Sequence, residues 1–496
     1  MASSSKTVAT LSGLVGGELV GEADPVVDDV THDSRKVRNG ALYVAIRGER
    51  ADGHQFVSAA LQAGAVAVCV DHEVATAVPQ IVVNDTRAVL GDLAAAVHDY
   101  PSLAVDVIGV TGTNGKTTVT HYVESIARHA GRVTGLVGTI HTRSAGSTIP
   151  ASLTTPEASD LQRTLADMRD HGVDLVAAEV SSHALDYGRV RGTRFAVAAF
   201  TNLSQDHLDF HGDMEAYREA KRSLFTEYDV GTAVIDIDDP TGADFAAGYE
   251  GELITVGQGN DFSIHSVETH ASHSTFTVST PRGAFSRKAP VTGDFNVSNL
   301  VLAAACCIAV GVDHDAVLAA MSYVAGVPGR FEVVSGEDPI TVIVDYAHTP
   351  EGVARAVETG RRLSRGRVIG LIGAGGDRDR AKRPAMGDAI SRADLAVITS
   401  DNPRSEDPAA IASAVMSGVA PGANHVLEID RRQAIDHAMN AAEDGDVVLI
   451  LGRGHEPTQD LGTEKIPFDD RQIAAESLAR RRKSAGNGPG SGSMSP

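Results

Sequence analysis

The sequence predicts an α/β protein of three domains: a central domain on a P-loop-type parallel sheet, a C-terminal Rossmann-like domain and a smaller N-terminal α/β domain. Its 496 residues exceed what one hydrophobic core usually covers, so about three domains are expected. Short apolar runs that end in polar or glycine-rich turns recur along the chain, as buried parallel strands do. One of these runs enters a glycine-rich loop that is followed by apolar residues at helical spacing.

The central domain is expected at residues 104–332. Its first predicted strand, 104–110, leads into TGTNGKTT and then into an amphipathic helix. Two further apolar runs, 175–180 and 195–200, also end in polar residues. Open parallel sheets bind ligands at the carboxyl ends of their strands, so we expect a ligand site where these runs end.

The C-terminal domain is expected at residues 333–483, after a hinge at VPGRFE. Four apolar runs precede polar loops there: 340–344 before DYAHTP, 368–372 before GAGGDRD, 395–399 before SDNPR and 447–451 before GRGHE. We predict that the four loops share one rim of a sheet. The terminal stretch, 484–496, is rich in Gly, Ser and Pro and is expected to be disordered.

The N-terminal domain is expected at residues 1–103, because this part has no phosphate loop and closes on the Pro-containing stretch HDYPSL. Short alternating runs between Glu227 and Ala289 predict additional β-structure in or beside the central domain.

The composition excludes several classes of protein. The chain has 43 Lys and Arg against 65 Asp and Glu, a formal net charge of −22, so nucleic acid is not an expected partner. The N-terminus lacks the features of a signal peptide, and the longest apolar run, 300–310, is too short to span a bilayer. We therefore expect a cytoplasmic protein without membrane insertion. The cysteines lack zinc or disulfide spacings and are expected to be buried apolar residues: Cys69, Cys306 and Cys307.

The strongest chemical signal is the loop after the first central strand. It comprises Gly112, Thr113, Asn114, Gly115, Lys116, Thr117 and Thr118. Small residues let backbone N–H groups approach phosphate oxygens, a lysine adds positive charge, and a threonine hydroxyl can bind Mg²⁺. The loop departs from the strict Walker pattern, because position 110 is Val rather than Gly. We predict that it binds phosphate groups.

Several further motifs accompany this loop: EVSSHAL, TNLSQDHLDFHG, EAYREAKRSLF, DYAHTP, GGDRDRAKRPAMG, SDNPRSEDP and GRGHE. Together they closely resemble the Mur ligase family over nearly the whole chain. The resemblance implies an ATP-dependent acid–amino acid ligase of peptidoglycan precursor synthesis, which activates a carboxylate as an acyl phosphate and then forms an amide. Within the family, the motifs are similar to those of enzymes that add meso-diaminopimelate to UDP-N-acetylmuramoyl-L-alanyl-D-glutamate.

The resemblance also implies a set of catalytic residues. Lys116 would neutralise phosphate charge, Thr117 and Glu179 would bind one Mg²⁺, and His207 would bind a second. Lys221 is similar to the family lysine that CO2 converts to N6-carboxylysine, another ligand of the second metal ion. Burial favours the neutral amine that this reaction requires.

Two groups of substrate-binding residues follow from the same resemblance. For ATP they are the glycine-rich loop with Asn299, Arg330, Asp345 and His348. For the UDP-linked substrate they are Ser34, Glu49, Arg50, Ala51, Thr154, Thr155, Ser181 and Arg189. Two positions depart from the family pattern: Leu153, where a polar residue is common, and Tyr187, where glutamine is common.

The amino-acid site is expected to select diaminopimelate. Its implied residues are Arg378, Asp401, Asn402, Pro403, Arg404, Gly452 and Glu456. The far end of diaminopimelate needs a cation for its carboxylate and oxygen acceptors for its ammonium group. Arg404 is expected to discriminate, because lysine has no carboxylate at that end and would leave the guanidinium unpaired.

Three alternatives stay open. The same ligation could use L-lysine or another diamino acid, or the chain could be a folylpolyglutamate-synthase-like ligase. A nucleotide-binding protein without catalysis is disfavoured, because Lys116, Glu179, His207 and Lys221 are all present. The expected partners are the UDP-N-acetylmuramoyl-dipeptide, diaminopimelate and ATP, and the expected state is a monomer.

Overall fold

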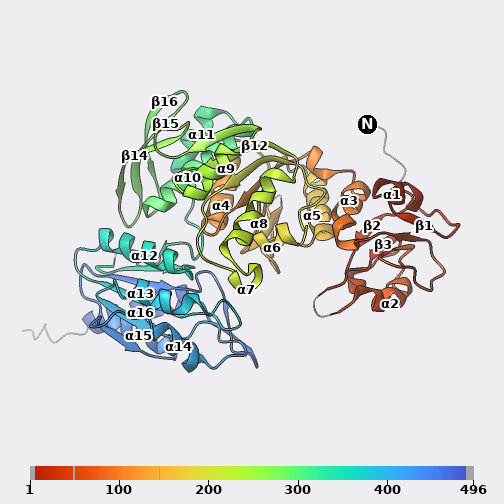
Figure 1. The fold of residues 1–496 in the computed structure, drawn as a ribbon. Coiled ribbons are helices and arrows are strands. Elements are labelled where there is room, and N and C mark those ends of the chain that lie inside the picture. The colour runs from red at the N-terminus through yellow and green to blue at the C-terminus, as the bar shows by residue number, and fades with distance from the viewer. Residues whose placement is uncertain (1–5, 49–50, 145, 337, 487–496) are drawn as a thin grey trace, which may run out of the picture. The chain divides into compact units, whose positions relative to one another are not determined.

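The computed structural model describes residues 6–48, 51–144, 146–336 and 338–486 (Figure 1). The chain divides into two compact units. The first comprises residues 1–202, 218–262 and 302–320, and the second comprises residues 203–217, 263–301 and 321–496. No helix in the described parts of the chain is long and apolar enough to cross a membrane.

The first unit begins with a five-stranded sheet in the order β1-β5-β4-β3-β2. Its elements are α1 (Val8–Leu14), β1 (Glu18–Val20), β2 (Asp29–Thr31), β3 (Ala41–Val44), α2 (Val57–Gln62), β4 (Ala67–Val70), β5 (Gln80–Val82) and α3 (Thr86–Val97). All strand pairs are parallel except β1 with β5. β3 and β4 are buried throughout, because α1 and α3 pack on one face and α2 on the other. This is the smaller α/β domain that the sequence predicts.

An eight-stranded sheet in the order β13-β12-β11-β6-β10-β7-β8-β9 forms the centre of the first unit. Its strands are β6 (Asp106–Thr111), β7 (Thr134–Val137), β8 (His141–Ser144), β9 (Ser147–Pro150), β10 (Leu175–Glu179), β11 (Phe195–Phe200), β12 (Val230–Asp236) and β13 (Glu252–Val256). Only the β7-β8-β9 pairings are antiparallel. β6 lies between β10 and β11, so the segments that follow these three strands meet at one edge.

Helices connect these strands and complete the unit. They are α4 (Lys116–His129), α5 (Ala158–Asp170), α6 (Ser182–Asp186), α8 (Met214–Thr226, partly in the second unit), α9 (Pro240–Ala247), α10 (Asp294–Ala309, also shared) and α11 (His314–Ala320). The predicted order of strand, glycine loop and helix is confirmed by β6 and α4. All three cysteines are buried, as predicted.

A three-stranded antiparallel sheet belongs to the second unit. It consists of β14 (Ser263–Thr269), β15 (Ser274–Thr280) and β16 (Gly283–Ala289). Burial alternates along β15, where Phe276 and Val278 point inward. With β12 and β13, this sheet confirms the β-structure predicted between residues 227 and 289. The same unit holds the short helix α7 (Leu208–His211).

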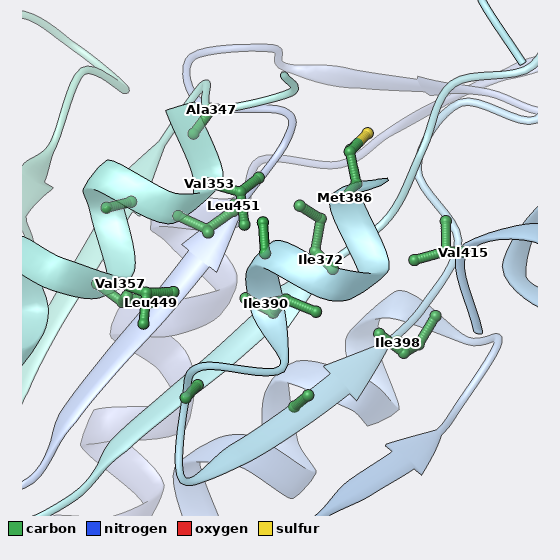
Figure 2. Close-up of a cluster of buried hydrophobic side chains, with 14 of the residues drawn as sticks. Ala347, Val353, Val357, Ile372, Met386, Ile390, Ile398, Val415, Leu449 and Leu451 are labelled. Atoms are coloured by element: carbon green, nitrogen blue, oxygen red, sulfur yellow. The ribbon is translucent and has the colours of Figure 1, made fainter. Parts of the chain in front are cut away.

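The C-terminal part of the second unit is a six-stranded sheet in the order β17-β18-β22-β19-β20-β21. Its elements are β17 (Glu332–Val333), β18 (Thr341–Asp345), α12 (Pro350–Leu363), β19 (Val368–Ile372), α13 (Lys382–Ile390), β20 (Leu395–Ile398), α14 (Pro408–Met416), β21 (His425–Leu427), α15 (Arg431–Ala441), β22 (Val447–Leu451) and α16 (Asp470–Gly486). Figure 2 shows Val353 and Val357 of α12, Met386 and Ile390 of α13 and Leu449 of β22, which belong to one buried cluster. α15 and α16 cover the opposite face, so helices lie on both faces of the sheet, as expected of the predicted Rossmann-like domain.

The predicted rim of polar loops is confirmed. β18, β22, β19 and β20 are neighbouring parallel strands, so the four loops that follow them leave the same edge of the sheet. After β22, a small hairpin of β23 (Thr458–Asp460) and β24 (Lys465–Pro467) precedes α16. That helix continues to Gly486, past the predicted limit at residue 483, and residues 487–496 of the predicted tail lie outside the described residues.

Candidate active site

The glycine-rich loop between β6 and α4 depends on two glycines with positive φ. Gly112 has φ +144° and Gly115 has φ +90°. A Cβ atom on Gly112 would lie 1.9 Å from Oγ1 of Thr201, so a larger residue does not fit there. The backbone N–H of Thr113 donates to the carbonyl of Asn202 at 2.8 Å. The segment after β11 therefore holds the loop in place.

Two lysines converge on this loop. Lys116, the first residue of α4, donates from Nζ to the carbonyl oxygens of Gly112 (2.8 Å) and Thr113 (2.9 Å). Lys221 of α8 is only 1% exposed, and its Nζ also donates to the Gly112 carbonyl at 2.8 Å. The N-terminus of α4 adds a positive potential. The site therefore combines several features that bind a polyphosphate.

Glu179, at the end of β10, provides a buried carboxylate beside the loop. It is 1% exposed, and its Oε2 accepts hydrogen bonds from Oγ1 of Thr117 (2.9 Å) and Oγ1 of Thr139 (3.0 Å). Its Oε1 accepts from the backbone N–H of Thr139 at 2.7 Å. A carboxylate and a threonine hydroxyl are hard oxygen donors, so Thr117 and Glu179 fit the predicted Mg²⁺.

His207 lies in the second unit, next to a buried ionic cluster. Its backbone has φ +55°, and its Nε2 is 3.5 Å from Oδ2 of Asp206. Asp206 also pairs with Nζ of Lys382 (2.9 Å) and Nε2 of His348 (3.2 Å). Burial alone would raise the pKa of Asp206. The larger opposing effect comes from its neighbours His348, Lys382 and His207, which hold that pKa well below its usual value. Glu179 and Lys221 belong to the first unit, so a metal site shared with His207 stays a prediction.

The remaining predicted nucleotide ligands also lie in the second unit. The Arg330 guanidinium is 4.3 Å from the ring centre of Tyr346. The Asp345 carboxylate accepts from the backbone N–H groups of Phe331 (2.7 Å) and Ala347 (2.9 Å), and Phe331 has φ +50°. Burial raises the pKa of Asp345. Asp345 thus fixes the backbone beside the predicted hinge, a role that the sequence does not reveal.

Asn299 lies on α10, where its Nδ2 donates to Oδ1 of Asn296 at 3.4 Å. It too belongs to the second unit, whereas the glycine-rich loop belongs to the first. It stays a prediction that Asn299 and the glycine-rich loop bind the same nucleotide.

Three residues that are predicted to bind the UDP-linked substrate lie beside Glu179. Oγ1 of Thr155 donates to the Glu179 carbonyl (2.7 Å) and accepts from the backbone N–H of Ser181 (3.1 Å). Thr154 and Thr139 share a hydrogen bond of 3.1 Å between their hydroxyls. The structure therefore brings this part of the predicted substrate site next to the predicted Mg²⁺ ligands.

Arg189, a fourth predicted ligand, belongs to a charged cluster that the sequence did not reveal. Its Nε lies 2.9 Å from Oε1 of Glu157, and Arg87 of α3 donates to Oε2 of the same carboxylate at 3.3 Å. Both guanidinium groups lie close to the ring of Tyr187, at 5.0 Å for Arg87 and 5.3 Å for Arg189. The ring of Tyr187 thus faces both arginines.

The other predicted UDP-substrate residues are in the N-terminal sheet domain. Ser34 starts a 3-10 helix, Ser34–Lys36, after β2. Ala51 is exposed, and its carbonyl accepts from the backbone N–H of Gly48 at 3.0 Å. Glu49 and Arg50 lie outside the described residues.

The predicted amino-acid site is assembled from loops after β19, β20 and β22. Nδ2 of Asn402 donates to Oε2 of Glu456 at 2.7 Å, and a Cβ atom on Gly452 would lie 2.7 Å from Oδ2 of Asp401. Arg404 has φ +52° and donates to the carbonyl of Gly376 at 2.5 Å. The loops therefore bring these residues together.

Arg378 and Pro403 complete this set. A Cβ atom on Gly375 would lie 3.1 Å from a terminal nitrogen of Arg404 and 3.7 Å from Cγ of Arg378, so both side chains flank the same glycine. The Pro403 carbonyl would lie 1.9 Å from a Cβ atom on Gly376. The loop thus has no space for a larger residue at position 376.

Sequence reasoning also missed buried groups that support the site. Asp206, Lys382 and Arg453 are each less than a tenth exposed. Asp206 is bonded to the predicted site residue His348 and Arg453 to Asn402, whereas Lys382 pairs with Asp206. Asp206 and Lys382 are separated by 176 positions, and periodicity carries no signal for such a contact. For Arg453, its place within GRGHE is the only signal in the sequence.

These features are typical of an α/β enzyme that uses a nucleoside triphosphate: a glycine-rich loop at a helix N-terminus, the oxygen atoms of Thr117 and Glu179 beside it, and loops with paired charges in a second α/β domain. The chain belongs to the Mur ligase family. Its family models match in order: Mur ligase family, catalytic domain at residues 26–98; Mur ligase middle domain at 110–307; and Mur ligase, glutamate ligase domain at 329–454.

Similar proteins match nearly the whole chain. The UDP-N-acetylmuramoyl-L-alanyl-D-glutamate--2,6-diaminopimelate ligase of Geobacillus kaustophilus is 42% identical over 487 residues, which cover 96% of this chain and 100% of that protein. The ligase of the same name from Gloeobacter violaceus is 46% identical and covers 91% of this chain and 93% of its own. A solved structure of a ligase of this name is 31% identical, with a TM-score of 0.66 over 92% of this chain and 96% of that one. The predicted three-domain α/β fold and the predicted family are confirmed.

Proposed function

We propose that this Mur ligase joins meso-diaminopimelate to UDP-N-acetylmuramoyl-L-alanyl-D-glutamate, with cleavage of ATP, in peptidoglycan precursor synthesis. Relatives that carry this activity in their names match more than nine-tenths of the chain. The observation that carries the amino-acid assignment is the loop cluster after β19, β20 and β22. It sets the Arg404 guanidinium and the Glu456 carboxylate in one group of loops, a pairing that suits an amino acid with both a carboxylate and an ammonium group at its far end.

The chemistry begins with phosphate binding. The loop amides and Lys116 bind and orient the ATP phosphates, and Lys116 stabilises the charge that develops when the γ-phosphate moves to the D-glutamate carboxylate. Thr117 and Glu179 would hold a Mg²⁺ ion, with a second held by His207 and by Lys221 as N6-carboxylysine. Bound metal ions would neutralise phosphate charge and so favour formation of the acyl phosphate.

Amide formation then depends on how the incoming amino acid is held. Arg404 donates to the far carboxylate, while Glu456, which accepts from the Asn402 amide, binds the far ammonium group. This fixes the near amine for attack on the acyl phosphate carbonyl, with release of inorganic phosphate. Lysine has the ammonium group but lacks the carboxylate, so it would leave Arg404 without its anion.

The test measures phosphate release from ATP, Mg²⁺ and the UDP-dipeptide with one amino acid added at a time. We expect rapid release with meso-diaminopimelate and at least about a hundredfold lower kcat/KM with L-lysine. Equal turnover with L-lysine would remove the specificity assignment. Release that requires a folate and glutamate instead would favour the folylpolyglutamate-like alternative. The monomeric state and the cytoplasmic location stay predictions.

A further inference from the structure

Arg453, in the loop after β22, is buried next to the predicted amino-acid site. Its side chain is fully buried, and a buried guanidinium needs hydrogen-bonded or ion-paired partners. Within the described residues its Nε has no hydrogen-bond partner but lies 3.9 Å from Oδ1 of Asp470, and its two terminal nitrogens make the hydrogen bonds. One terminal nitrogen donates to Oδ1 of Asn402 at 2.7 Å. The other donates to the carbonyls of Thr458 (2.7 Å) and Phe468 (3.0 Å). Arg453 therefore links the loop after β20 to both sides of the β23–β24 hairpin.

These bonds determine which way the amide of Asn402 faces. Its Oδ1 accepts from Arg453 and also from the backbone N–H of Asp460 at 2.8 Å. With two donors directed at the oxygen, the amide nitrogen faces Oε2 of Glu456 and donates to it at 2.7 Å. Without Arg453, one of the two donors that fix this orientation is lost.

Arg453 also acts on the charge of Glu456, whose Oε2 lies 3.8 Å from one of its terminal nitrogens. Burial raises the pKa of Glu456, and Asp401 raises it further. The Asn402 hydrogen bond, Arg453 and Arg404 act in the opposite direction on that pKa. Arg453 thus favours the ionised carboxylate directly and through Asn402.

We propose that Arg453 is a positioning residue for the incoming amino acid: it orients Asn402 and faces Glu456, so that the carboxylate is held ready for the far ammonium group of diaminopimelate. This role rests on the proposed function. Arg453 bonds to three acceptors in different directions, and the fork of a guanidinium can reach them where one ammonium group reaches fewer.

The experiment compares Arg453→Met and Arg453→Lys with a matched control, Arg367→Met. Arg367 pairs with Asp446 through two nitrogens, immediately before β19, at the opposite end of the strands from the site. We expect Arg453→Met to raise the KM for diaminopimelate at least about tenfold, with the KM for ATP within about twofold of the parent. Arg453→Lys should recover part of this loss, and Arg367→Met should leave both KM values unchanged.

A second variant covers the case in which Arg453→Met does not fold. Asn402→Asp keeps an acceptor for Arg453 and for the Asp460 N–H, but it removes the donor to Glu456 and places a negative charge beside it. We expect a melting temperature near that of the parent and an increase of about tenfold in the KM for diaminopimelate. A folded Arg453→Met or Asn402→Asp variant with an unchanged KM would overturn the proposal. If the proposed function were wrong, the parent protein itself would release phosphate at a rate that does not depend on diaminopimelate.

Discussion

Lys116 and Lys221 donate to the same acceptor, the carbonyl oxygen of Gly112, each at 2.8 Å. Two ammonium groups on one oxygen repel each other, and the repulsion is larger where solvent is excluded, as it is around Lys221. A bound polyphosphate would relieve this repulsion, and so would the loss of charge from one lysine. The arrangement therefore favours both phosphate binding by Lys116 and reaction of Lys221 with CO2.

Replacing Lys221 tests the carboxylysine directly. Lys221→Arg keeps the positive charge but cannot form a carbamate, so kcat should fall at least about a hundredfold. Removing bicarbonate should lower the activity of the parent, and mass spectrometry should find one CO2 adduct on Lys221. Lys288→Arg, at an exposed position of β16, is the control and should match the parent. Full activity of Lys221→Arg would contradict the assignment.

The sequence predicts the local parts of this fold well. The strands at 195–200, 368–372 and 447–451 occur at the predicted residues, because a buried parallel strand is a continuous apolar run that ends in a turn. The predicted strand at 104–110 begins instead at Asp106, because residues 101–103 form a 3-10 turn.

Long-range partners of charged residues could not be predicted in the same way. Arg87 meets Glu157 across 70 positions, and Arg453 meets Asn402 across 51. Each of these side chains is unremarkable in its own segment, and only the packing of separate loops decides which charges become buried together. The family resemblance supplied residues that are predicted to contact ligands, but not the buried residues that hold those side chains in place.

Arg404 should set the preference for diaminopimelate over lysine. Arg404→Met removes the cation that would bind the far carboxylate, so kcat/KM for diaminopimelate should fall about a hundredfold, while the low value for L-lysine should change little. Phosphate release with each amino acid measures both values. Arg392→Met, which removes an exposed arginine 3.8 Å from Asp388, should change neither. An equal loss with both amino acids would show that Arg404 supports the loop rather than selecting the substrate.

Diaminopimelate binding should weaken at acidic pH. Burial and then Asp401 raise the pKa of Glu456, so this carboxylate takes up its proton at a higher pH than an ordinary glutamate and loses its charge as the pH falls. We expect the KM for diaminopimelate to rise between about pH 8 and about pH 5.5, with a smaller change in the KM for ATP. Glu456→Gln should raise the KM at every pH and flatten the profile. A profile of Glu456→Gln as steep as that of the parent would assign the titration to another group.

Arg87 should contribute to binding of the UDP-linked substrate. Arg87 and Arg189 share the single carboxylate of Glu157, so this cluster keeps a net positive charge for an anionic substrate. Arg87→Met should raise the KM for the UDP-dipeptide about tenfold and leave the KM for ATP nearly unchanged.

Because the Tyr187 ring contacts both guanidinium groups, Tyr187→Phe should behave like the parent, whereas Tyr187→Leu should raise the KM for the UDP-dipeptide by about threefold. Arg194→Met, which removes a half-exposed arginine 3.4 Å from Asp229, is the control. If Arg87→Met and Arg194→Met gave the same KM for the UDP-dipeptide, the cluster would serve only to join α3 to the segment around Glu157.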